Sequence, residues 1–424
     1  MASMEAQSTR VFLPPGISPR LAAAAVQAAT QVAPQWEAAA RRGEELQWRV
    51  LACLQEQRLG EADLGAGVGY GYGDSGRAKL DRAMARLFGA EAALVRQSVV
   101  SGTHAVALAL FAALRPGDEL LVATGEPYPS LAGILGLRHG TPGSLAEWGV
   151  SCRVADGPER ALAEVGSRTK AVLIQRSRGY AWRSSLGVGA IRELIGRLRA
   201  VRPELRTVVD NCYGELVEEL EPTAVGADLI AGSLIKNPGG GLAPGGGYVA
   251  GRAELVERAA ARLTAPGLGS QIGPALSPHR IFFQGLFLAP QVVAAAVQGA
   301  VFAARFFELL GFETLPGWEE PRTDIVQAVR LGSAEAVLAF CRGVQMSAPV
   351  DAHAVPEPGD LPGYSQPVVM AGGTFVQGAS LELSADAPLA PPYIVYLQGG
   401  LTRSHAVWGA MGAARELERR GFLP

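Results

Sequence analysis

The hydrophobic positions of this chain alternate between short apolar runs and longer segments with helical spacing. The apolar runs at residues 92–95, 119–124, 170–175, 206–210 and 227–233 predict strands, and the segments at 103–114 and 190–201 predict helices between them. This alternation is typical of α/β proteins. Continuous apolar runs indicate strands that are buried on both faces. We therefore expect a large, mostly parallel sheet with ligands at the carboxyl ends of its strands.

Two further regions have helical spacing. Residues 18–58 predict two helices, with Ser18 as a candidate N-cap and Pro34 as the break between them. Residues 287–311 form the most hydrophobic segment, but they include Gln298 and Arg305. We interpret this segment as a long buried helix, with a membrane span as the alternative.

The pattern changes beyond about residue 311. A Pro- and Gly-rich stretch at 349–367 precedes a strand-like segment at 375–384, which together indicate a smaller α+β part. A chain of 424 residues also exceeds what one hydrophobic core usually organises. We expect an N-terminal helical segment at 1–64, a large domain at 65–300 and a small C-terminal domain at 301–424.

Composition and charge exclude several classes of partner. The net charge of -2 and the lack of a dense basic stripe argue against nucleic acid as a partner. The four cysteines lie far apart, as in proteins of a reducing cytosol, and the first residues do not show a basic region followed by a long apolar run, the pattern expected of a secretory signal. The five histidines are scattered, so no metal site is expected. We expect a cytoplasmic protein that binds neither nucleic acid nor membranes.

Lys236 has unusual neighbours for a lysine. It follows the apolar run at 227–233 and precedes a cluster of glycines. Most lysines are solvated surface charges, whereas one placed here can be desolvated. Desolvation lowers the pKa of an ammonium group and frees the amine to act as a nucleophile. Ser233 can add a hydroxyl group to the same pocket.

Asp210 ends the apolar run at 206–210, twenty-six residues before Lys236. Both residues are therefore expected at one edge of the sheet. Pyridoxal 5′-phosphate (PLP) forms a Schiff base with a lysine and needs a carboxylate at its pyridine nitrogen. Asp210 and Lys236 match these two requirements, although an aspartate at this place is also a common helix cap or turn former.

Two other segments can contribute to the same site. The segment 101–103, with the sequence Ser-Gly-Thr, precedes an apolar helix whose N-terminus is suited to a phosphate group. On its own, this pattern is usually only a helix cap. Tyr128 follows the apolar run at 119–124 and can stack on a cofactor ring, although a tyrosine there is more often a packing residue.

Several motifs together resemble one family of PLP enzymes. The motifs are GYGYGDSGR, SGTHA, GEPY, IQRSRGYAWR, VVDNCYGE, SLIKNPGGGLAPGGGY, RIFFQGLFLAP, TFVQGASLELSADAP and PPYIVYLQGGLT, which cover most of residues 65–405. In these motifs the chain resembles the methionine γ-lyase-related proteins that are often labelled aluminium-resistance proteins. The resemblance implies a fold-type I PLP-dependent transferase fold and carbon–sulfur lyase activity on a sulfur-containing amino acid such as methionine or cystathionine.

The resemblance also implies roles for individual residues. Lys236 would hold the cofactor covalently and act in catalysis, Asp210 would pair with the pyridine nitrogen, and Tyr128 would stack on the ring and serve as the first candidate acid. The phosphate would be bound by Ser101, Gly102, Thr103 and Ser233. Tyr70 and Tyr72 are the candidates to reach the phosphate of a neighbouring subunit. A homodimer is then the minimum active unit, and a homotetramer fits as well.

The group that binds the substrate carboxylate is less well defined. Related sequences have Arg-Glu before the Pro-Tyr of the C-terminal segment, whereas this chain has Leu389 and Ala390 before its prolines. The remaining candidates are Arg178, Arg176 and Arg403, and each is equally open to a structural ion pair. Two alternatives therefore stay open. One is another PLP reaction, such as transamination, racemisation or aldol cleavage, and the other is a non-catalytic stress-response protein that kept the fold.

Overall fold

The computed structural model describes residues 11–138, 140–361 and 364–424, and these divide into two units. The larger unit comprises residues 46–179 and 185–288, and the smaller one comprises residues 11–45, 180–184 and 289–424. These bounds differ from the expected domain segments at 64/65 and 300/301. The boundaries at 45/46 and 288/289 lie within continuous helices, α3 (Ala33–Glu56) and α10 (His279–Leu309), and the short segment 180–184 between β4 and α8 also belongs to the smaller unit. A helix that continues through a boundary hides it from sequence analysis, and α10 does so even with Pro290 beside the change of unit.

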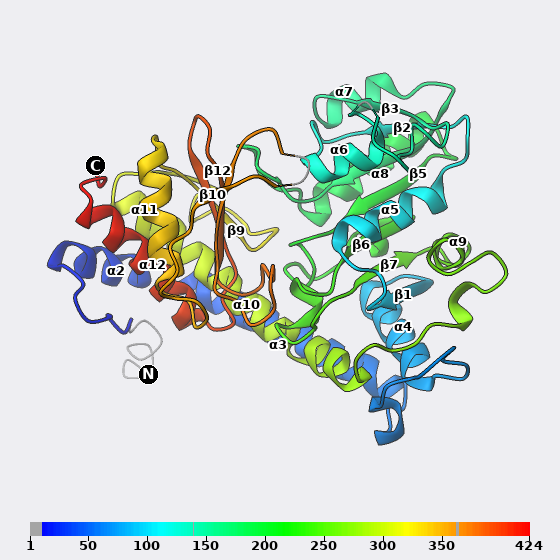
Figure 1. The fold of residues 1–424 in the computed structure, drawn as a ribbon, viewed down its shortest axis with the longest axis horizontal. Coiled ribbons are helices and arrows are strands. Elements are labelled where there is room, and N and C mark those ends of the chain that lie inside the picture. The colour runs from blue at the N-terminus through cyan, green and yellow to red at the C-terminus, as the bar shows by residue number, and fades with distance from the viewer. Residues whose placement is uncertain (1–10, 139, 362–363) are drawn as a thin grey trace. The chain divides into compact units, whose positions relative to one another are not determined.

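A seven-stranded mixed sheet organises the larger unit (Figure 1). Its strands, in spatial order, are β1 (Ala92–Arg96), β7 (Gly247–Gly251), β6 (Leu229–Ser233), β5 (Arg206–Asp210), β4 (Thr169–Gln175), β2 (Glu119–Val122) and β3 (Ser151–Val154). Strands β6, β5, β4, β2 and β3 are parallel to one another, whereas β7 is antiparallel to both β6 and β1. The prediction of an α/β fold with a mostly parallel sheet is confirmed.

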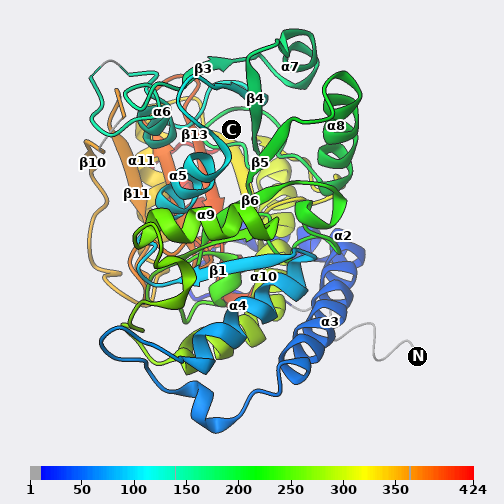
Figure 2. The same cartoon turned by 90° about the vertical axis from the view of Figure 1, so that its right-hand side faces the viewer.

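Helices cover this sheet on both faces. The helices are α4 (Ser75–Phe88), α5 (Gly102–Ala113), α6 (Pro129–Leu135), α7 (Pro158–Glu164), α8 (Val188–Val201) and α9 (Ala253–Leu263), with short 3-10 turns at Glu61–Leu64, Pro222–Val225, Asn237–Gly239 and Gly269–Gln271. Helices α5 and α9 pack together on one face (Figure 2), where their apolar side chains join Val208 and Leu229 in one core. The alternate strand residues Val209 and Ile230 are also fully buried. Strands covered on both faces explain the continuous apolar runs.

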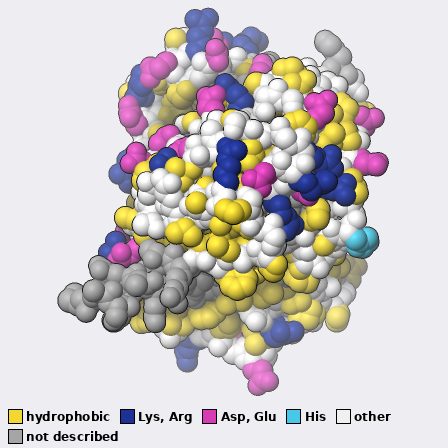
Figure 3. Space-filling model, turned by 90° about the vertical axis from the view of Figure 1, so that its left-hand side faces the viewer, with side chains coloured by type: hydrophobic (Ala, Val, Ile, Leu, Met, Phe, Trp, Pro, Cys, Tyr) yellow, Lys and Arg dark blue, Asp and Glu magenta, His cyan; other side chains and the backbone are white. Residues whose placement is uncertain are grey.

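The smaller unit has a six-stranded sheet in which all paired strands are antiparallel. Its strands, in spatial order, are β10 (Pro358–Gly359), β11 (Val368–Ala371), β12 (Ser384–Pro388), β13 (Ile394–Gln398), β9 (Val326–Arg330) and β8 (Glu313–Leu315). Helices α2 (Pro19–Gln31), α11 (Ala334–Gln345) and α12 (Arg403–Arg419) accompany it, with α11 and α12 packed against each other. On the face drawn in Figure 3, acidic and basic side chains are interspersed with hydrophobic ones.

Local signals account for several element ends. The Ser18 hydroxyl oxygen accepts a hydrogen bond from Leu21 N at 3.3 Å, which confirms the predicted cap of α2. The segment at 375–384 was expected to be a strand, but it is irregular up to Ser384. The Glu382 carboxylate accepts hydrogen bonds from Phe375 N and Val376 N, both at 2.9 Å. These two backbone N–H groups are therefore bonded to a side chain and not to the carbonyl groups of a neighbouring strand.

Helix α10 contains the most hydrophobic segment of the chain. Its length and composition would suffice to cross a membrane, but 72% of its most apolar window is buried inside the protein. This burial supports the interpretation as a core helix. Gln298 shows how a polar residue of this helix is accommodated in the interior. Its side-chain amide donates to the Trp36 backbone carbonyl at 2.8 Å, and the Gln298 backbone carbonyl accepts from the Trp36 indole N–H at 2.9 Å.

Candidate functional site

Lys236 lies in the larger unit just after β6, which ends at Ser233. The lysine side chain points to the turn that follows the neighbouring strand β5, and Lys236 Nζ lies 3.9 Å from the centroid of the Tyr213 ring. Asp210 is the last residue of β5 and is aligned with Ala231 of β6. The parallel pairing of β5 and β6 therefore brings Asp210 and Lys236 to the same edge of the sheet, as the sequence predicted.

Tyr128 lies against Asp210. Its hydroxyl group donates a hydrogen bond to Asp210 Oδ2 at 3.0 Å, and Cys212 N donates to the other carboxylate oxygen at 3.2 Å. Tyr128 immediately precedes α6, and its backbone N–H donates to Gln175 at the end of β4. Burial and the nearby Asp210 charge hold the pKa of Tyr128 well above its usual value. The hydroxyl group therefore stays protonated near neutral pH.

The N-terminus of α5 forms a tight cradle beside these residues. Ser101 caps the helix by accepting a hydrogen bond from His104 N at 3.0 Å. A Cβ atom at Gly102 would lie 3.1 Å from Cys212 Sγ and 3.3 Å from Ser233 Cβ. Glycine thus allows the first turn of α5 to approach the ends of β5 and β6 closely. Thr103 Oγ1 lies 3.4 Å from Ser130 Oγ, which adds two hydroxyl groups near this helix end.

These residues fit a PLP molecule by their chemistry and their placement. The ring nitrogen needs a buried carboxylate, which Asp210 supplies, and the phosphate suits the positive end of a helix with free N–H groups and hydroxyls. The amine of Lys236 lies at the same sheet edge. Among the described residues, no group of three or more His, Cys, Asp or Glu side chains is arranged to hold a metal ion.

The electrostatic environment of Lys236 differs from the sequence expectation. Burial alone would lower the pKa of its ammonium group, as we expected. The acidic groups of Cys212, Tyr213, Asp210 and Glu215 surround it, however, and together they raise the pKa above its usual value. The apolar run before Lys236 indicated burial, but it carried no information about the acidic groups that the turn after β5 contributes.

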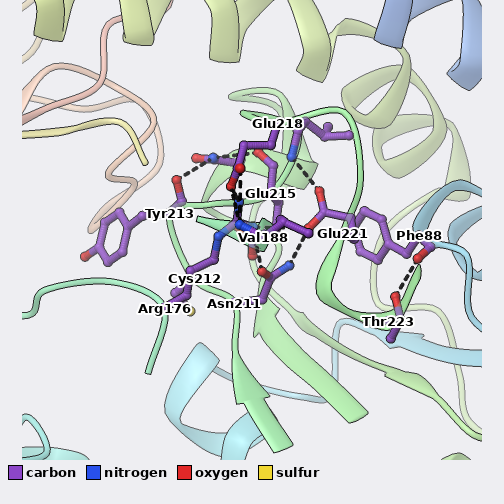
Figure 4. Close-up of polar contacts among 12 residues, drawn as sticks. Phe88, Arg176, Val188, Asn211, Cys212, Tyr213, Glu215, Glu218, Glu221 and Thr223 are labelled. Atoms are coloured by element: carbon purple, nitrogen blue, oxygen red, sulfur yellow. Dashed lines mark hydrogen bonds and ion pairs between the residues drawn. The ribbon is translucent and has the colours of Figure 1, made fainter. Parts of the chain in front are cut away.

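A buried polar network adjoins the site on the turn at 211–221 (Figure 4). Arg176 is fully buried and donates to Asn211, Glu218 and Glu221 at 2.8, 2.6 and 3.3 Å. Asn211 also donates to Glu221 at 2.8 Å and to the Tyr248 hydroxyl at 3.2 Å. The network ties the ends of β4 and β5 to this turn.

Sequence reasoning did not single out three residues beside Lys236. Tyr213 contacts its ammonium group, Glu215 contributes to its electrostatic environment, and Asn237 donates to the carbonyl groups of Tyr213 and Glu215 at 3.0 and 2.8 Å. The available signal was the acidic and aromatic pair inside the motif VVDNCYGE, directly after a buried strand.

The three candidate arginines lie in different environments. The guanidinium group of Arg176 is engaged in the network described above, which favours a structural role. Arg178 is 3% exposed and precedes Gly179, whose Cβ position would be 3.8 Å from Tyr128 Cβ. Arg403 belongs to the smaller unit, where its guanidinium carbon lies 4.5 Å from the centroid of the Trp36 ring. Among these three arginines, Arg178 is the one next to a residue that packs against Tyr128.

Tyr70 and Tyr72 lie on the Gly-rich loop before α4. Each is 70% exposed, and their rings stack with centroids 5.5 Å apart. The Tyr70 carbonyl accepts a hydrogen bond from Gly273 N at 2.9 Å, which fastens the loop to the segment before α10. The two rings are therefore presented at the surface of the larger unit.

Comparison with known proteins gives consistent matches over nearly the whole chain. The family model described as methionine gamma-lyase matches residues 21–418. The Bacillus subtilis protein YnbB, described as uncharacterized, is 46% identical over 388 residues, which are 90% of this chain and 92% of that protein.

Two solved structures share both the sequence and the fold. A carbon-sulfur lyase involved in aluminum resistance from Clostridium novyi is 41% identical, with a TM-score of 0.90 over 94% of this chain and 96% of that one. A protein proposed to be a cystathionine beta-lyase involved in aluminum resistance, from Clostridium acetobutylicum, is 44% identical, with a TM-score of 0.91 over 95% and 96% of the two chains.

Proposed function

Because this chain belongs to the methionine gamma-lyase family, we propose that it is a PLP-dependent carbon–sulfur lyase of fold type I. Its substrate would be a sulfur-containing amino acid such as methionine or cystathionine, and its products a thiol, ammonia and a 2-oxo acid. The observation that carries the proposal is the meeting of Lys236, Asp210 and the N-terminus of α5 at one edge of the sheet.

Each of these residues has a defined task toward the cofactor. Lys236 would hold PLP by a covalent bond to its nitrogen, and Asp210 would keep the pyridine nitrogen protonated. Ser101, Gly102, Thr103 and Ser233 would bind the phosphate. When bound, PLP supplies an electron sink for bond changes at the substrate Cα.

Two side chains would move protons. The Lys236 nitrogen is the candidate base for the Cα proton, because a lysine that anchors the cofactor would be released near the reacting carbon. Tyr128 is the candidate acid for the leaving sulfur, since its raised pKa keeps the hydroxyl protonated. Arg178 is the first candidate for the substrate carboxylate, because its segment runs beside Tyr128.

The anchoring lysine can be identified directly, because the chain contains only three lysines, Lys79, Lys170 and Lys236. The protein is incubated with PLP, reduced with borohydride and digested, and the labelled peptide is located by mass spectrometry. We expect the label on Lys236, and we expect K236A to lose the visible absorbance of lysine-bound PLP while K170R keeps it. A label on another lysine would overturn the assignment.

The reaction is tested with the purified protein, PLP and methionine, cystathionine or cysteine. Release of a thiol together with a 2-oxo acid supports the proposed lyase. Transfer of the amino group to an added keto acid without ammonia release would indicate an aminotransferase instead. Absence of any turnover in a protein that binds PLP would favour a non-catalytic role.

We also propose that two copies of the chain share their active sites, with Tyr70 or Tyr72 of one copy reaching the phosphate bound by the other. Exposed, stacked rings on an anchored loop support this arrangement. In a test, inactive K236A is mixed and refolded with a Y70A/Y72A double variant. Mixed dimers with one intact site should regain activity, whereas sites built from a single copy would stay at the level of the separate variants.

A further inference from the structure

A second buried carboxyl group lies on the turn that is hydrogen-bonded to Asn237, the residue after Lys236. The Glu215 side chain is fully buried on the turn after β5, and the Tyr248 hydroxyl of β7 donates a hydrogen bond to its Oε1 at 2.8 Å. The other oxygen, Oε2, has no hydrogen-bond partner among the residues that the structure describes. A carboxylate with an unsatisfied buried oxygen is costly, so this environment favours the protonated form.

The backbone of β6 fits closely around this group. A Cβ atom at Gly232 would lie 2.5 Å from Glu215 Oε1 and 2.7 Å from the Tyr248 hydroxyl oxygen. Gly232 is the neighbour of Ser233, and both belong to the strand that leads directly to Lys236. Only glycine at this position leaves room for the carboxyl group to lie against the strand.

The turn that carries Glu215 is also fastened to the segment around Lys236. Asn237 donates to the Tyr213 and Glu215 carbonyl oxygens at 3.0 and 2.8 Å. Tyr213 has a φ angle of +73°, a conformation that a non-glycine residue adopts only where its surroundings enforce it. The same Tyr213 places its ring 3.9 Å from Lys236 Nζ. The geometry therefore holds the lysine and the carboxyl group in a defined relationship.

Several titratable groups act on this pair. Glu215 is influenced by Glu221, Tyr248 and Lys236, and Lys236 is influenced by Glu215 and by Cys212, Tyr213 and Asp210. Burial, with the Glu221 carboxylate adding to it, raises the pKa of Glu215 to about 8. Glu215 can thus change its charge close to neutral pH.

We propose that Glu215 is a positioning residue for Lys236, and that its carboxyl group, held by Tyr248 against Gly232, tunes the proton affinity of the Lys236 nitrogen. A negative Glu215 favours the protonated nitrogen, whereas a protonated Glu215 leaves the nitrogen neutral more readily. This inference rests on the proposed role of Lys236 as the cofactor anchor. It adds a group that adjusts the lysine without touching substrate or cofactor.

The test measures the absorbance of lysine-bound PLP as a function of pH, which requires no turnover. Replacing Glu215 by Gln removes the charge but keeps an oxygen for Tyr248. We expect the titration midpoint of E215Q to move to lower pH by about one unit, as expected for loss of a neighbouring opposite charge. The matched control is E219Q, which removes an exposed carboxylate from the same turn and should titrate like the wild type.

The outcomes separate the two proposals. Absence of lysine-bound PLP in the wild-type protein would overturn the proposed function, and this inference with it. A wild-type spectrum with an unshifted midpoint in E215Q would overturn this inference alone. If E215Q does not fold or does not bind PLP, Y248F gives the second test. It keeps the carboxyl group but removes its donor, so the midpoint should again move to lower pH, and an unshifted midpoint would reject the role.

Discussion

The Tyr128 hydroxyl group donates a hydrogen bond to Asp210 Oδ2 over 3.0 Å, so the candidate acid and the candidate partner of the pyridine nitrogen are in direct contact. The two residues are 82 positions apart in the chain; Tyr128 follows β2, and Asp210 is the last residue of β5. Their contact makes the edge of the larger sheet one chemical site, and it allows the contributions of single groups to be separated by substitution.

Replacing Tyr128 by Phe removes the hydroxyl group but keeps the ring. We expect kcat to fall by about 100-fold or more, the usual effect of losing a general acid, with little change in PLP affinity. Steady-state kinetics and a PLP titration followed by absorbance measure the two effects. Y128A, which also loses the ring, should weaken PLP binding. A wild-type kcat in Y128F would assign the acid role to Lys236.

Replacing Gly102 by Ala places a Cβ atom in the cradle at the N-terminus of α5, where Cys212 Sγ and Ser233 Cβ are 3.1 and 3.3 Å away. The overpacked turn should weaken PLP binding by about 1–3 kcal/mol. The dissociation constant of PLP gives the measurement. G189A is the matched control, because nothing lies within 4 Å of a Cβ at that helical glycine. Equal PLP affinity in both variants would exclude the cradle as the phosphate site.

Replacing Arg176 by Met tests whether this residue is structural. The change leaves Glu218 and Glu221 without their buried cation, so the free energy of unfolding should drop by about 3–5 kcal/mol. Urea denaturation of the cofactor-free protein measures the loss. R197M, which breaks the exposed pair with Glu159, should unfold like the wild type. A stable R176M with a raised KM would instead point to substrate binding.

Glu215 should also make the stability of the cofactor-free protein depend on pH. The pKa of Glu215 is about 8 in the folded protein, whereas the usual value of a glutamate is 4.5. The folded state therefore prefers the protonated carboxyl group. The resulting stabilisation is fully present below about pH 4.5 and is lost as the pH rises through 8. Denaturation across this range should therefore show the wild type losing stability relative to E215Q. Parallel curves for the two proteins would contradict the raised pKa.

The larger sheet shows which strands the hydrophobic pattern can predict and which it cannot. All five predicted strands of the larger unit are present, because strands buried on both faces need continuous apolar runs. Strands β3 and β7 were missed. The first is short and only partly buried, and the second begins and ends with glycine, a residue that is depleted in strands. Strand β7 pairs antiparallel between β1 and β6, and this position depends on the tertiary structure and cannot be predicted from its five residues.

The sequence alone determined the α/β fold class and the motifs that resemble the family, because buried strands and Gly-rich turns leave regular patterns. It also selected Lys236 and Asp210, since Asp210 ends one such strand and Lys236 follows another. Only the tertiary structure decided which acidic groups act on Lys236, that Arg176 is engaged in the interior, and that the turn of Glu215 is bonded to Asn237 beside the lysine. These relationships depend on pairing and turn geometry across β4, β5, β6 and β7, and local sequence does not encode distances between segments that meet only on folding.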